Sequence, residues 1–346
     1  MRNGLYSAGI AITGTGAGIP AGRLSNHDLA QMVETSDEWI TTRTGIKERC
    51  LVASGESLTD IGAQAARQAL GMAQVDPEAI DLVILATSTP DDLFGSAVGI
   101  QTAIGAKQAV GFDLTAACSG FVFGLVNAAQ FIRTGAYQKV LLIGADVLSR
   151  WVDWSDRSTC ILFGDGAGAV VIEATAPERD RLLGFELCSD GQLSHTLNLA
   201  YQGADQPLVN SIQVNQGHYQ PITMKGKEVY RFAVEKVPEV ISKALFHADL
   251  KAEQVDWLLL HQANQRIMDA VAQRLNLPPE RVISNLASYG NTSAASIPLA
   301  LDEAQRAGKL NSGDIIAMSG FGAGLTWGSA IVQWQIDQRS KQVPSV

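Results

Sequence analysis

Short runs of consecutive apolar residues alternate with helix-like segments along the chain. One run covers 80–85 (IDLVIL) and a second covers 255–260 (VDWLLL). Runs of this length and composition are typical of strands buried on both faces of a sheet. Each run follows a helical pattern that ends in Ala-Leu, and 11 positions separate that Leu from the Asp of the run in both cases. Equal spacing indicates that the chain contains an internal duplication.

Further landmarks repeat at nearly the same offset. The apolar run 140–144 corresponds to 315–319, an offset of 175 residues, and Cys118 and Asn291 each lie 17 residues before a glycine, Gly135 and Gly308. Any α/β chain repeats strand–helix units, but that does not explain equal spacings. We therefore divide the chain into two α/β halves, 1–175 and 176–346, and interpret Cys118 and Asn291 as equivalent positions.

The segment after Cys118 predicts a central helix. Its apolar residues, from Phe121 to Ile132, cover all faces, as does the corresponding segment from Ala294 to Leu301. A helix that is apolar all round is buried. Two buried helices between sheets predict a five-layered α-β-α-β-α arrangement.

Composition excludes several classes of protein. The 346 residues are 46% hydrophobic and carry a net charge of −9 without a Lys/Arg run, which argues against nucleic acid as a partner. The four cysteines form no C-x-x-C pair, so we expect no zinc site, disulfide or other metal site. No apolar run is long enough to span a bilayer and no signal peptide is evident, so we expect a cytoplasmic protein without membrane contact.

Cys118 is the cysteine whose position favours chemistry. It lies where a predicted strand (112–114) gives way to the buried helix, among small residues that leave room for a substrate. A helix N-terminus lowers the pKa of a thiol, so we predict a nucleophile. Cys50, Cys160 and Cys188 are interpreted as buried structural residues.

His261 and Asn291 are the predicted partners of this thiol. His261 ends a strand, where α/β sites gather polar groups, although a structural histidine is the alternative. Asn291 suits an N-cap and could still donate through its amide. The glycine-rich string 320–324 lets backbone N–H groups approach an oxyanion, and we expect Cys118 and Ala323 to supply them.

Two reaction classes fit a Cys-His-Asn set. One is a hydrolase with a Cys–His pair oriented by Asn. The other is a thioester condensation, in which the cysteine is acylated while His and Asn stabilise the enolate left by decarboxylation. The second scheme needs two oxyanion sites, and the sequence offers a side-chain site and a backbone site. Condensation is therefore favoured.

Five segments together resemble the β-ketoacyl-[acyl-carrier-protein] synthase III family: 35–46, 112–120, 261–264, 289–296 and 322–330. The resemblance runs from about residue 5 to about 334. It implies the thiolase fold, an acyltransferase, and decarboxylative condensation of acetyl-CoA with malonyl-acyl carrier protein. The products would be acetoacetyl-acyl carrier protein, CO₂ and CoA, at the start of type II fatty acid biosynthesis. Acyl-CoA enters as a substrate, and no cofactor is expected.

The resemblance also implies roles for individual residues. Cys118 would carry the acyl group, and His261 with Asn291 would serve decarboxylation. The Cys-His-Asn set implies the initiating type, since elongating synthases resemble it but use Cys-His-His. Trp39 and Arg157 would sandwich the adenine of CoA. The pantetheine tunnel or its mouth would be lined by Thr35, Arg43, Tyr230, Ala263 and Asn264. Tyr230 departs from the Phe often found there, and Ser158 follows Arg157 where Gly is common.

Partner contacts are implied at two surfaces. Arg231, Arg266 and Arg274 would form a basic patch for the acidic acyl carrier protein, although solvated arginines are the alternative. Phe94 would reach into the acyl pocket of a partner subunit, so we expect a homodimer. Segment 192–221 is longer than in shorter family members and should cap the acyl pocket. Residues after Gln335 are predicted to be disordered.

Alternatives to this function remain at this stage. One is a related condensing enzyme or acyltransferase of secondary metabolism that accepts other acyl-CoA donors. A second is a thioester hydrolase. A non-catalytic binding module is disfavoured because the Cys-His-Asn set is intact.

Overall fold

Two five-stranded mixed sheets form the framework of the protein. The computed structural model describes residues 7–336. The strands of the first sheet, in spatial order, are β1 (Gly9–Gly18), β7 (Asp165–Thr175), β6 (Lys139–Val147), β4 (Leu82–Ala86) and β5 (Val110–Leu114). Those of the second are β8 (Leu182–Ser189), β16 (Thr326–Gln333), β15 (Ile315–Gly322), β13 (Trp257–Leu260) and β14 (Val282–Ile283).

The two sheets repeat one topology. In the first, β4 is parallel to β5 and β6, while β7 is antiparallel to β6 and β1. In the second, β13 is parallel to β14 and β15, while β16 is antiparallel to β15 and β8. The predicted strands 80–85 and 255–260 thus become β4 and β13, at equivalent places.

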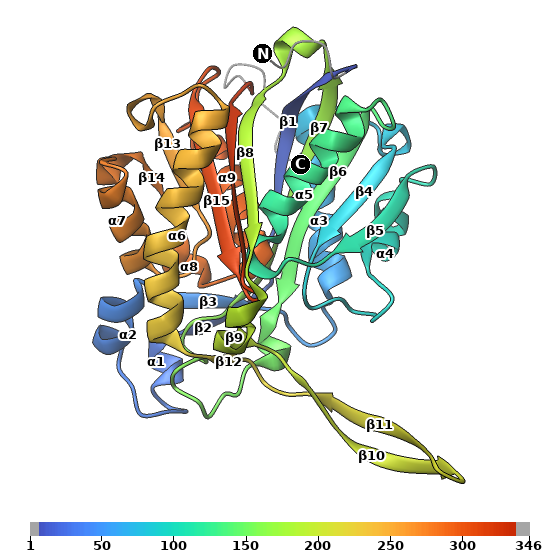
Figure 1. The fold of residues 1–346 in the computed structure, drawn as a ribbon, viewed down its shortest axis with the longest axis vertical. Coiled ribbons are helices and arrows are strands. Elements are labelled where there is room, and N and C mark those ends of the chain that lie inside the picture. The colour runs from blue at the N-terminus through green and yellow to red at the C-terminus, as the bar shows by residue number, and fades with distance from the viewer. Residues whose placement is uncertain (1–6, 337–346) are drawn as a thin grey trace.

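Helices complete three further layers (Figure 1). α3 (Leu58–Ala73) and α4 (Ala97–Ile104) cover the outer face of the first sheet. α6 (Gly226–His247) and α7 (Gln265–Arg274) cover the second. α5 (Gly120–Arg133) and α9 (Ser296–Arg306) lie between the sheets and contact both. The five-layered arrangement predicted from the sequence is confirmed.

Glycines in β1 allow unusually close packing of α3 on the first sheet. A Cβ at Gly14, Gly16 or Gly18 would lie 1.9–2.2 Å from a backbone oxygen of α3. The oxygens approached belong to Ala69, Ala65 and Ile61, one helical turn apart. The Gly-x-Gly-x-Gly motif therefore serves helix–strand packing.

The central helices correct the predicted equivalence of Cys118 and Asn291. Each helix follows a short 3-10 turn, η2 (Ala117–Ser119) or η8 (Ser293–Ala295), that begins with a residue of positive φ, 46° at Ala117 and 50° at Ser293. These matched starts pair Cys118 with Ala294. The equal count of 17 residues from Cys118 and from Asn291 to a glycine was misleading, because each count runs across a central helix. α5 has 14 residues and α9 has 11, so equal distances to the end of the helix do not mean equal positions at its start.

The remaining elements lie around the site end of the sheets. An exposed hairpin of β10 (Tyr201–Val209) and β11 (Ile212–Tyr219) projects from the body (Figure 1). The other elements are β2 (Gly22–Ser25), β3 (Glu48–Leu51), β9 (Leu197–Asn198), β12 (Thr223–Met224), α1 (Asn26–Leu29), α2 (Asp37–Thr44) and α8 (Leu286–Tyr289). Within 7–336, no helix combines the length and apolarity that crossing a membrane requires. The predicted disorder after Gln335 falls almost wholly on 337–346, outside the described residues.

Candidate active site

Cys118 lies in the η2 turn that leads into α5, and its side chain is buried. Burial raises the pKa of the thiol to about 12, although a hydrogen bond from the Ser293 hydroxyl, 3.3 Å from Sγ, acts to lower it. The thiolate predicted from the helix N-terminus is therefore not the resting form. Loss of hydration disfavours the charged sulfur more than the helix end stabilises it.

His261 immediately follows β13 and is fully enclosed. Its backbone N–H donates to the Ser319 carbonyl at 2.8 Å, which fixes it at the strand end. Its ring meets Phe321 edge-on, with the ring centroids 5.5 Å apart. Burial lowers the pKa of the imidazole to about 3, so the ring is neutral at physiological pH.

One hydroxyl decides which ring nitrogen of His261 carries the proton. Ser296 Oγ lies 2.7 Å from Nδ1 and 2.8 Å from the Ser293 carbonyl. When the hydroxyl donates to that carbonyl, it accepts from Nδ1–H and leaves Nε2 as an acceptor. When it donates to Nδ1 instead, Nε2 carries the proton and becomes a donor. Rotation of the Ser296 hydroxyl thus switches His261 between base and hydrogen-bond donor.

Asn291 is held by backbone on both sides. Its N–H donates to Leu162 O and its carbonyl accepts from Gly164 N, both at 2.9 Å. Its side-chain Oδ1 accepts the Ser293 N–H at 2.9 Å. The side-chain oxygen therefore closes a turn just before η8, whose N-cap is Thr292 and not Asn291 as the sequence had suggested, and the NH₂ group is left to donate.

Two pockets meet at Cys118. The larger, of about 720 Å³, is lined mainly by apolar side chains, among them Leu148, Trp151 and Leu199. The second, of about 500 Å³, contains His261 and Asn291 and extends to charged residues at the surface. Cys118 lines both pockets. A substrate entering through the second pocket could therefore leave its acyl group in the first.

The glycine-rich string lies against the Cys118 backbone, as predicted. A Cβ at Gly322 would lie 2.5 Å from the Cys118 backbone nitrogen, so only glycine permits this approach. Ala323, the next residue, lines the same pocket as Cys118. Cys118 and Ala323, the two residues expected to supply an oxyanion site, therefore line one pocket.

Comparisons with known proteins agree with this geometry. Models described as 3-oxoacyl-[acyl-carrier-protein (ACP)] synthase III and its C-terminal part match residues 112–191 and 245–334. The β-ketoacyl-[acyl-carrier-protein] synthase III of Nostoc sp. strain PCC 7120 is 66% identical over 95% of this chain and 99% of its own. The chain belongs to the β-ketoacyl-[acyl-carrier-protein] synthase III family.

Solved structures show the same relationship. The 3-oxoacyl-[acyl-carrier-protein] synthase III of Aquifex aeolicus is 45% identical, with a TM-score of 0.86 over 94% of this chain and 100% of that one. A priming β-ketosynthase from a polyketide biosynthetic pathway is 33% identical, with a TM-score of 0.87 over 97% and 99% of the two chains. The thiolase fold expected from the family resemblance is therefore confirmed.

Four of the residues that the family resemblance assigns to CoA line the second pocket: Arg43, Tyr230, Ala263 and Asn264. Asn264 also has structural contacts, because its Nδ2 donates to Arg43 O at 3.0 Å and its Oδ1 caps α7. That helix begins at Gln265, directly after Asn264. Thr35 is not among the residues that line this pocket.

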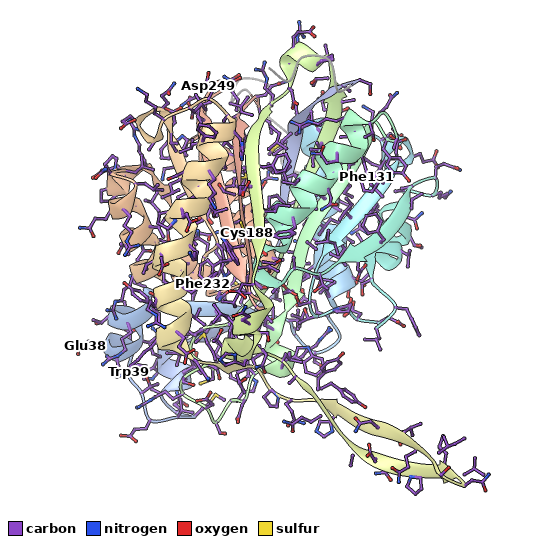
Figure 2. The ribbon with its side chains drawn as sticks, viewed as in Figure 1. Glu38, Trp39, Phe131, Cys188, Phe232 and Asp249 are labelled. Atoms are coloured by element: carbon purple, nitrogen blue, oxygen red, sulfur yellow. The ribbon has the colours of Figure 1, made fainter. Side chains whose placement is uncertain are left out.

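Trp39 lies on α2 (Figure 2), and the guanidinium groups of Arg157 and Arg43 lie against its ring. The Arg157 guanidinium lies 4.8 Å from the centre of the Trp39 ring, and that of Arg43 lies 4.3 Å from it. A planar ring held in contact on both faces needs about 7–8 Å between its neighbours. Arg157 must therefore move before an adenine can enter the predicted sandwich.

The three predicted docking arginines, Arg231, Arg266 and Arg274, are all exposed. Arg266 lines the second pocket, and its guanidinium lies 6.0 Å from the Tyr230 ring. Lys227 also lines this pocket and was missed. A signal existed, because Lys227 precedes Arg231 by four positions on one helix and therefore shares its face.

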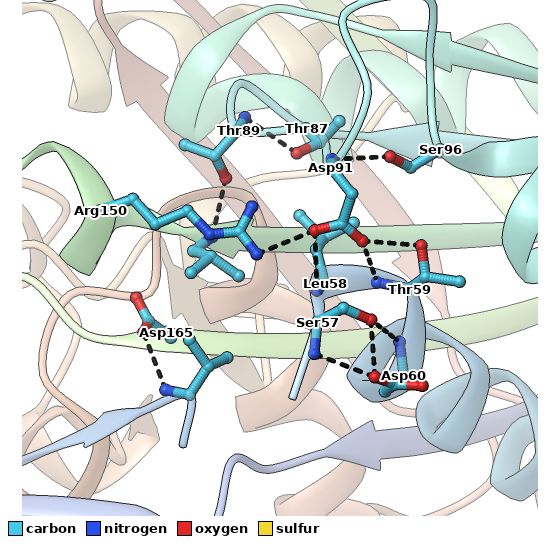
Figure 3. Close-up of polar contacts among 12 residues, drawn as sticks. Ser57, Leu58, Thr59, Asp60, Thr87, Thr89, Asp91, Ser96, Arg150 and Asp165 are labelled. Atoms are coloured by element: carbon cyan, nitrogen blue, oxygen red, sulfur yellow. Dashed lines mark hydrogen bonds and ion pairs between the residues drawn. The ribbon is translucent and has the colours of Figure 1, made fainter. Parts of the chain in front are cut away.

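Phe94 is 99% exposed, at the tip of a loop whose base is fixed. Asp91 fixes that base by accepting from the Thr59 backbone N–H and from Arg150, both at 2.8 Å (Figure 3). Its own N–H donates to the Ser96 hydroxyl at 2.8 Å. Leu93, the preceding residue, is 80% exposed as well, so two large apolar side chains face solvent at this loop.

Segment 192–221 caps the larger pocket only at its two ends. Leu197, Leu199 and Tyr219 line the pocket, whereas the hairpin between them points away from it. The segment thus contributes to the wall of this pocket through residues near its two ends, while most of the hairpin between them takes no part. Every residue of β10 and β11 is exposed.

The other cysteines do not join the site. Cys50 and Cys160 are buried and Cys188 is half-buried on β8 (Figure 2). All four cysteines are free thiols. Among residues 7–336, no cluster of His, Cys, Asp or Glu is suited to hold a metal ion.

Proposed function

We propose that the protein condenses acetyl-CoA with malonyl-acyl carrier protein and releases acetoacetyl-acyl carrier protein, CO₂ and CoA. The observation that supports this most is the junction of two pockets at Cys118. His261 and Asn291 line the second pocket, which we take as the substrate tunnel. An acyl group transferred to Cys118 would lie in the apolar pocket. The tunnel would then be free for the second thioester.

The polar groups divide between the two half-reactions. The backbone N–H groups of Cys118 and Ala323 stabilise the oxyanion formed when Cys118 attacks acetyl-CoA. After CoA leaves, the malonyl thioester carbonyl lies between the Asn291 amide and His261 Nε2. As CO₂ leaves, negative charge grows on that carbonyl oxygen, and both donors stabilise it. The resulting enolate carbon attacks the acetyl carbonyl and the bond from that carbon to Sγ breaks. The released Cys118 thiolate then takes up one proton from water.

His261 donates in this scheme only in the Nε2–H form. The neutral ring reaches this form by rotation of the Ser296 hydroxyl towards Nδ1, without gaining a charge. A neutral donor is suited to a buried site, because a buried imidazolium is costly.

The surface around the tunnel fits the two substrates. Trp39 and Arg157 receive the adenine once Arg157 swings out, and the exposed Lys227, Arg231 and Arg266 attract the acidic carrier protein. Phe94 of a second copy completes the acyl pocket in a homodimer. We assign the protein to the cytoplasm, where these substrates are found.

A second candidate is a priming synthase with a longer starter. The apolar pocket of about 720 Å³ is far larger than an acetyl group needs, and a polyketide-priming β-ketosynthase shares the fold. Entry of Phe94 from a second copy would reduce this space, which favours acetyl.

The test is intact-mass measurement after incubation with a panel of acyl-CoAs of increasing length. Wild-type protein should gain one acetyl group, and Cys118→Ser should gain none. His261→Ala and Asn291→Ala should still be acetylated but lose malonyl decarboxylation. Acetylation of Cys118→Ser would contradict the nucleophile, and loss of acetylation in both other variants would favour a hydrolase-like base.

A further inference from the structure

Arg49, on β3, is a buried cation that the proposed reaction does not use. It is 0% exposed, and within residues 7–336 every hydrogen-bond acceptor of its guanidinium is uncharged. Burial lowers the pKa of the guanidinium to about 10, so the group still carries its charge at physiological pH. A buried charge without an acidic partner adds little to stability, so its presence here points to another role.

The guanidinium of Arg49 joins two separate segments of the chain. Nε and Nη2 both donate to the Ile161 carbonyl, Nε at 3.1 Å. Nη1 donates to Oδ1 of Asn26 at 2.6 Å. A planar fork that places two donors on one oxygen fixes the direction of the contact as well as its distance. Arg49 therefore holds the Ile161 peptide in one orientation.

The Ile161 peptide leads directly into the backbone that holds Asn291. Leu162, the next residue, accepts the Asn291 N–H through its carbonyl at 2.9 Å, and the Gly164 N–H donates to the Asn291 carbonyl at 2.9 Å. Phe163, between them, pairs with Asn291 in an isolated parallel β-bridge. These three residues form the backbone support of Asn291, so a movement of the Ile161 peptide would be passed on to it.

The aliphatic stem of Arg49 packs against the same backbone. A Cβ at Gly290, directly before Asn291, would lie 3.0 Å from Arg49 Cγ and 3.0 Å from the Leu162 carbonyl oxygen. Gly290 has a φ of 69°, which suits glycine. A Cβ at Gly164 would lie 3.5 Å from Arg49 Cβ. The chain on each side of the β-bridge therefore lies close to Arg49.

Asn26 continues the network to α2. Its Nδ2 donates to Oδ1 of Asp37 at 2.8 Å, and Asp37 is the first residue of α2. The same helix carries Arg43, which lines the second pocket. Arg49 therefore ties the helix that the proposed function assigns to CoA to the backbone support of Asn291.

We propose that Arg49 is a positioning residue for malonyl decarboxylation, because it holds the Asn291 amide where the thioester oxygen develops charge. The inference rests on the donor role proposed for Asn291. A donor must lie within about 2.7–3.1 Å of the oxyanion, and a misplacement of about 1 Å costs about 10²-fold in rate. The oxyanion site for acetylation, at Cys118 and Ala323, contains none of the residues of this network. Acetylation therefore does not depend on Arg49.

Two substitutions test the guanidinium. Arg49→Met keeps an apolar stem and removes every donor. Arg49→Lys keeps the charge but loses the fork, and it serves as the second variant if the first does not fold. Arg133→Met is the matched control, because Arg133 is 3% exposed at the end of α5 and pairs with Asp180 at 2.6 Å. It removes a buried arginine without touching the support of Asn291.

The experiment follows the two half-reactions separately, at a temperature at which circular dichroism shows each variant to be folded. Decarboxylation is measured as release of labelled CO₂ from malonyl-acyl carrier protein, and acetylation is measured with saturating radiolabelled acetyl-CoA. Arg49→Met should slow decarboxylation by about 10²-fold and Arg49→Lys by less, while acetylation changes little. Arg133→Met should keep the wild-type ratio of the two rates.

A double variant shows whether Arg49 acts through Asn291. In an Asn291→Ala background, Arg49→Met should cause no further loss of decarboxylation, because both changes remove the same donor. A purely structural arginine would instead slow both half-reactions alike and would add its full loss in this background.

Three results would overturn the positioning role. They are wild-type decarboxylation by Arg49→Met, equal slowing of both half-reactions by Arg49→Met and Arg49→Lys, and a further loss of about 10²-fold in the Asn291→Ala background. Decarboxylation at the wild-type rate by Asn291→Ala alone, or failure of wild-type protein to be acetylated, would instead contradict the proposed function.

Discussion

Gly322→Ala tests the backbone oxyanion site with a single added carbon. The new Cβ would lie 2.5 Å from the Cys118 nitrogen, whereas ordinary contact begins at 3.4 Å, so the two segments must separate by about 0.9 Å. An oxyanion donor must lie within about 2.7–3.1 Å of the oxygen, and loss of one donor costs about 10²- to 10³-fold in rate, or about 2.7–4 kcal/mol. We expect acetylation of Cys118 to slow by that factor.

The assay is rapid-quench acetylation by acetyl-CoA, with thermal unfolding followed by circular dichroism. Overpacking should lower the free energy of unfolding of Gly322→Ala by about 1–3 kcal/mol. Gly71→Ala is the matched control, because a Cβ there meets nothing within 4 Å on an exposed face of α3. It should raise stability by about 0.5–1 kcal/mol and leave acetylation unchanged. Wild-type acetylation by Gly322→Ala would refute the backbone oxyanion site.

Three further predictions follow from the site. Burial lowers the pKa of His261 from 6.5 to about 3, so the contribution of the neutral ring to stability is present above pH 6.5 and is lost as pH falls towards 3. His261→Gln should therefore flatten the fall in Tm between these two pH values. A slope of Tm against pH equal to that of wild type would contradict a neutral buried ring. Arg157→Ala should raise KM for acetyl-CoA roughly 2- to 30-fold, because the cation–π contact of the guanidinium with the adenine in the proposed sandwich is lost. KM for acetyl-pantetheine, which lacks adenine, should not change. Equal effects on the two KM values would exclude the sandwich with Trp39. Arg266→Glu should raise KM for malonyl-acyl carrier protein about tenfold at low salt and less at high salt, while KM for acetyl-CoA changes little. An equal rise of KM for both substrates would refute the docking patch.

Local sequence pattern was enough to predict much of the architecture. Apolar runs at equal spacing identified β4 and β13, and the all-round apolar segments identified the central helices α5 and α9. These features depend on periodicity within about 15 residues, which the sequence shows directly. The position of Cys118 at a strand-to-helix junction was visible for the same reason.

Tertiary structure decided the electrostatics and the partners of that thiol. Ser293, 175 residues away, reaches Sγ only because the two halves face each other. Burial, which no local pattern measures, reversed the expected pKa shift of Cys118. A helix shorter by one turn displaced the true equivalence from Asn291 to Ala294. The sequence by itself determined the elements and the position of the candidate nucleophile. Only the packed fold determined which groups surround this thiol, because desolvation and contacts between distant residues exist only once the sheets are stacked.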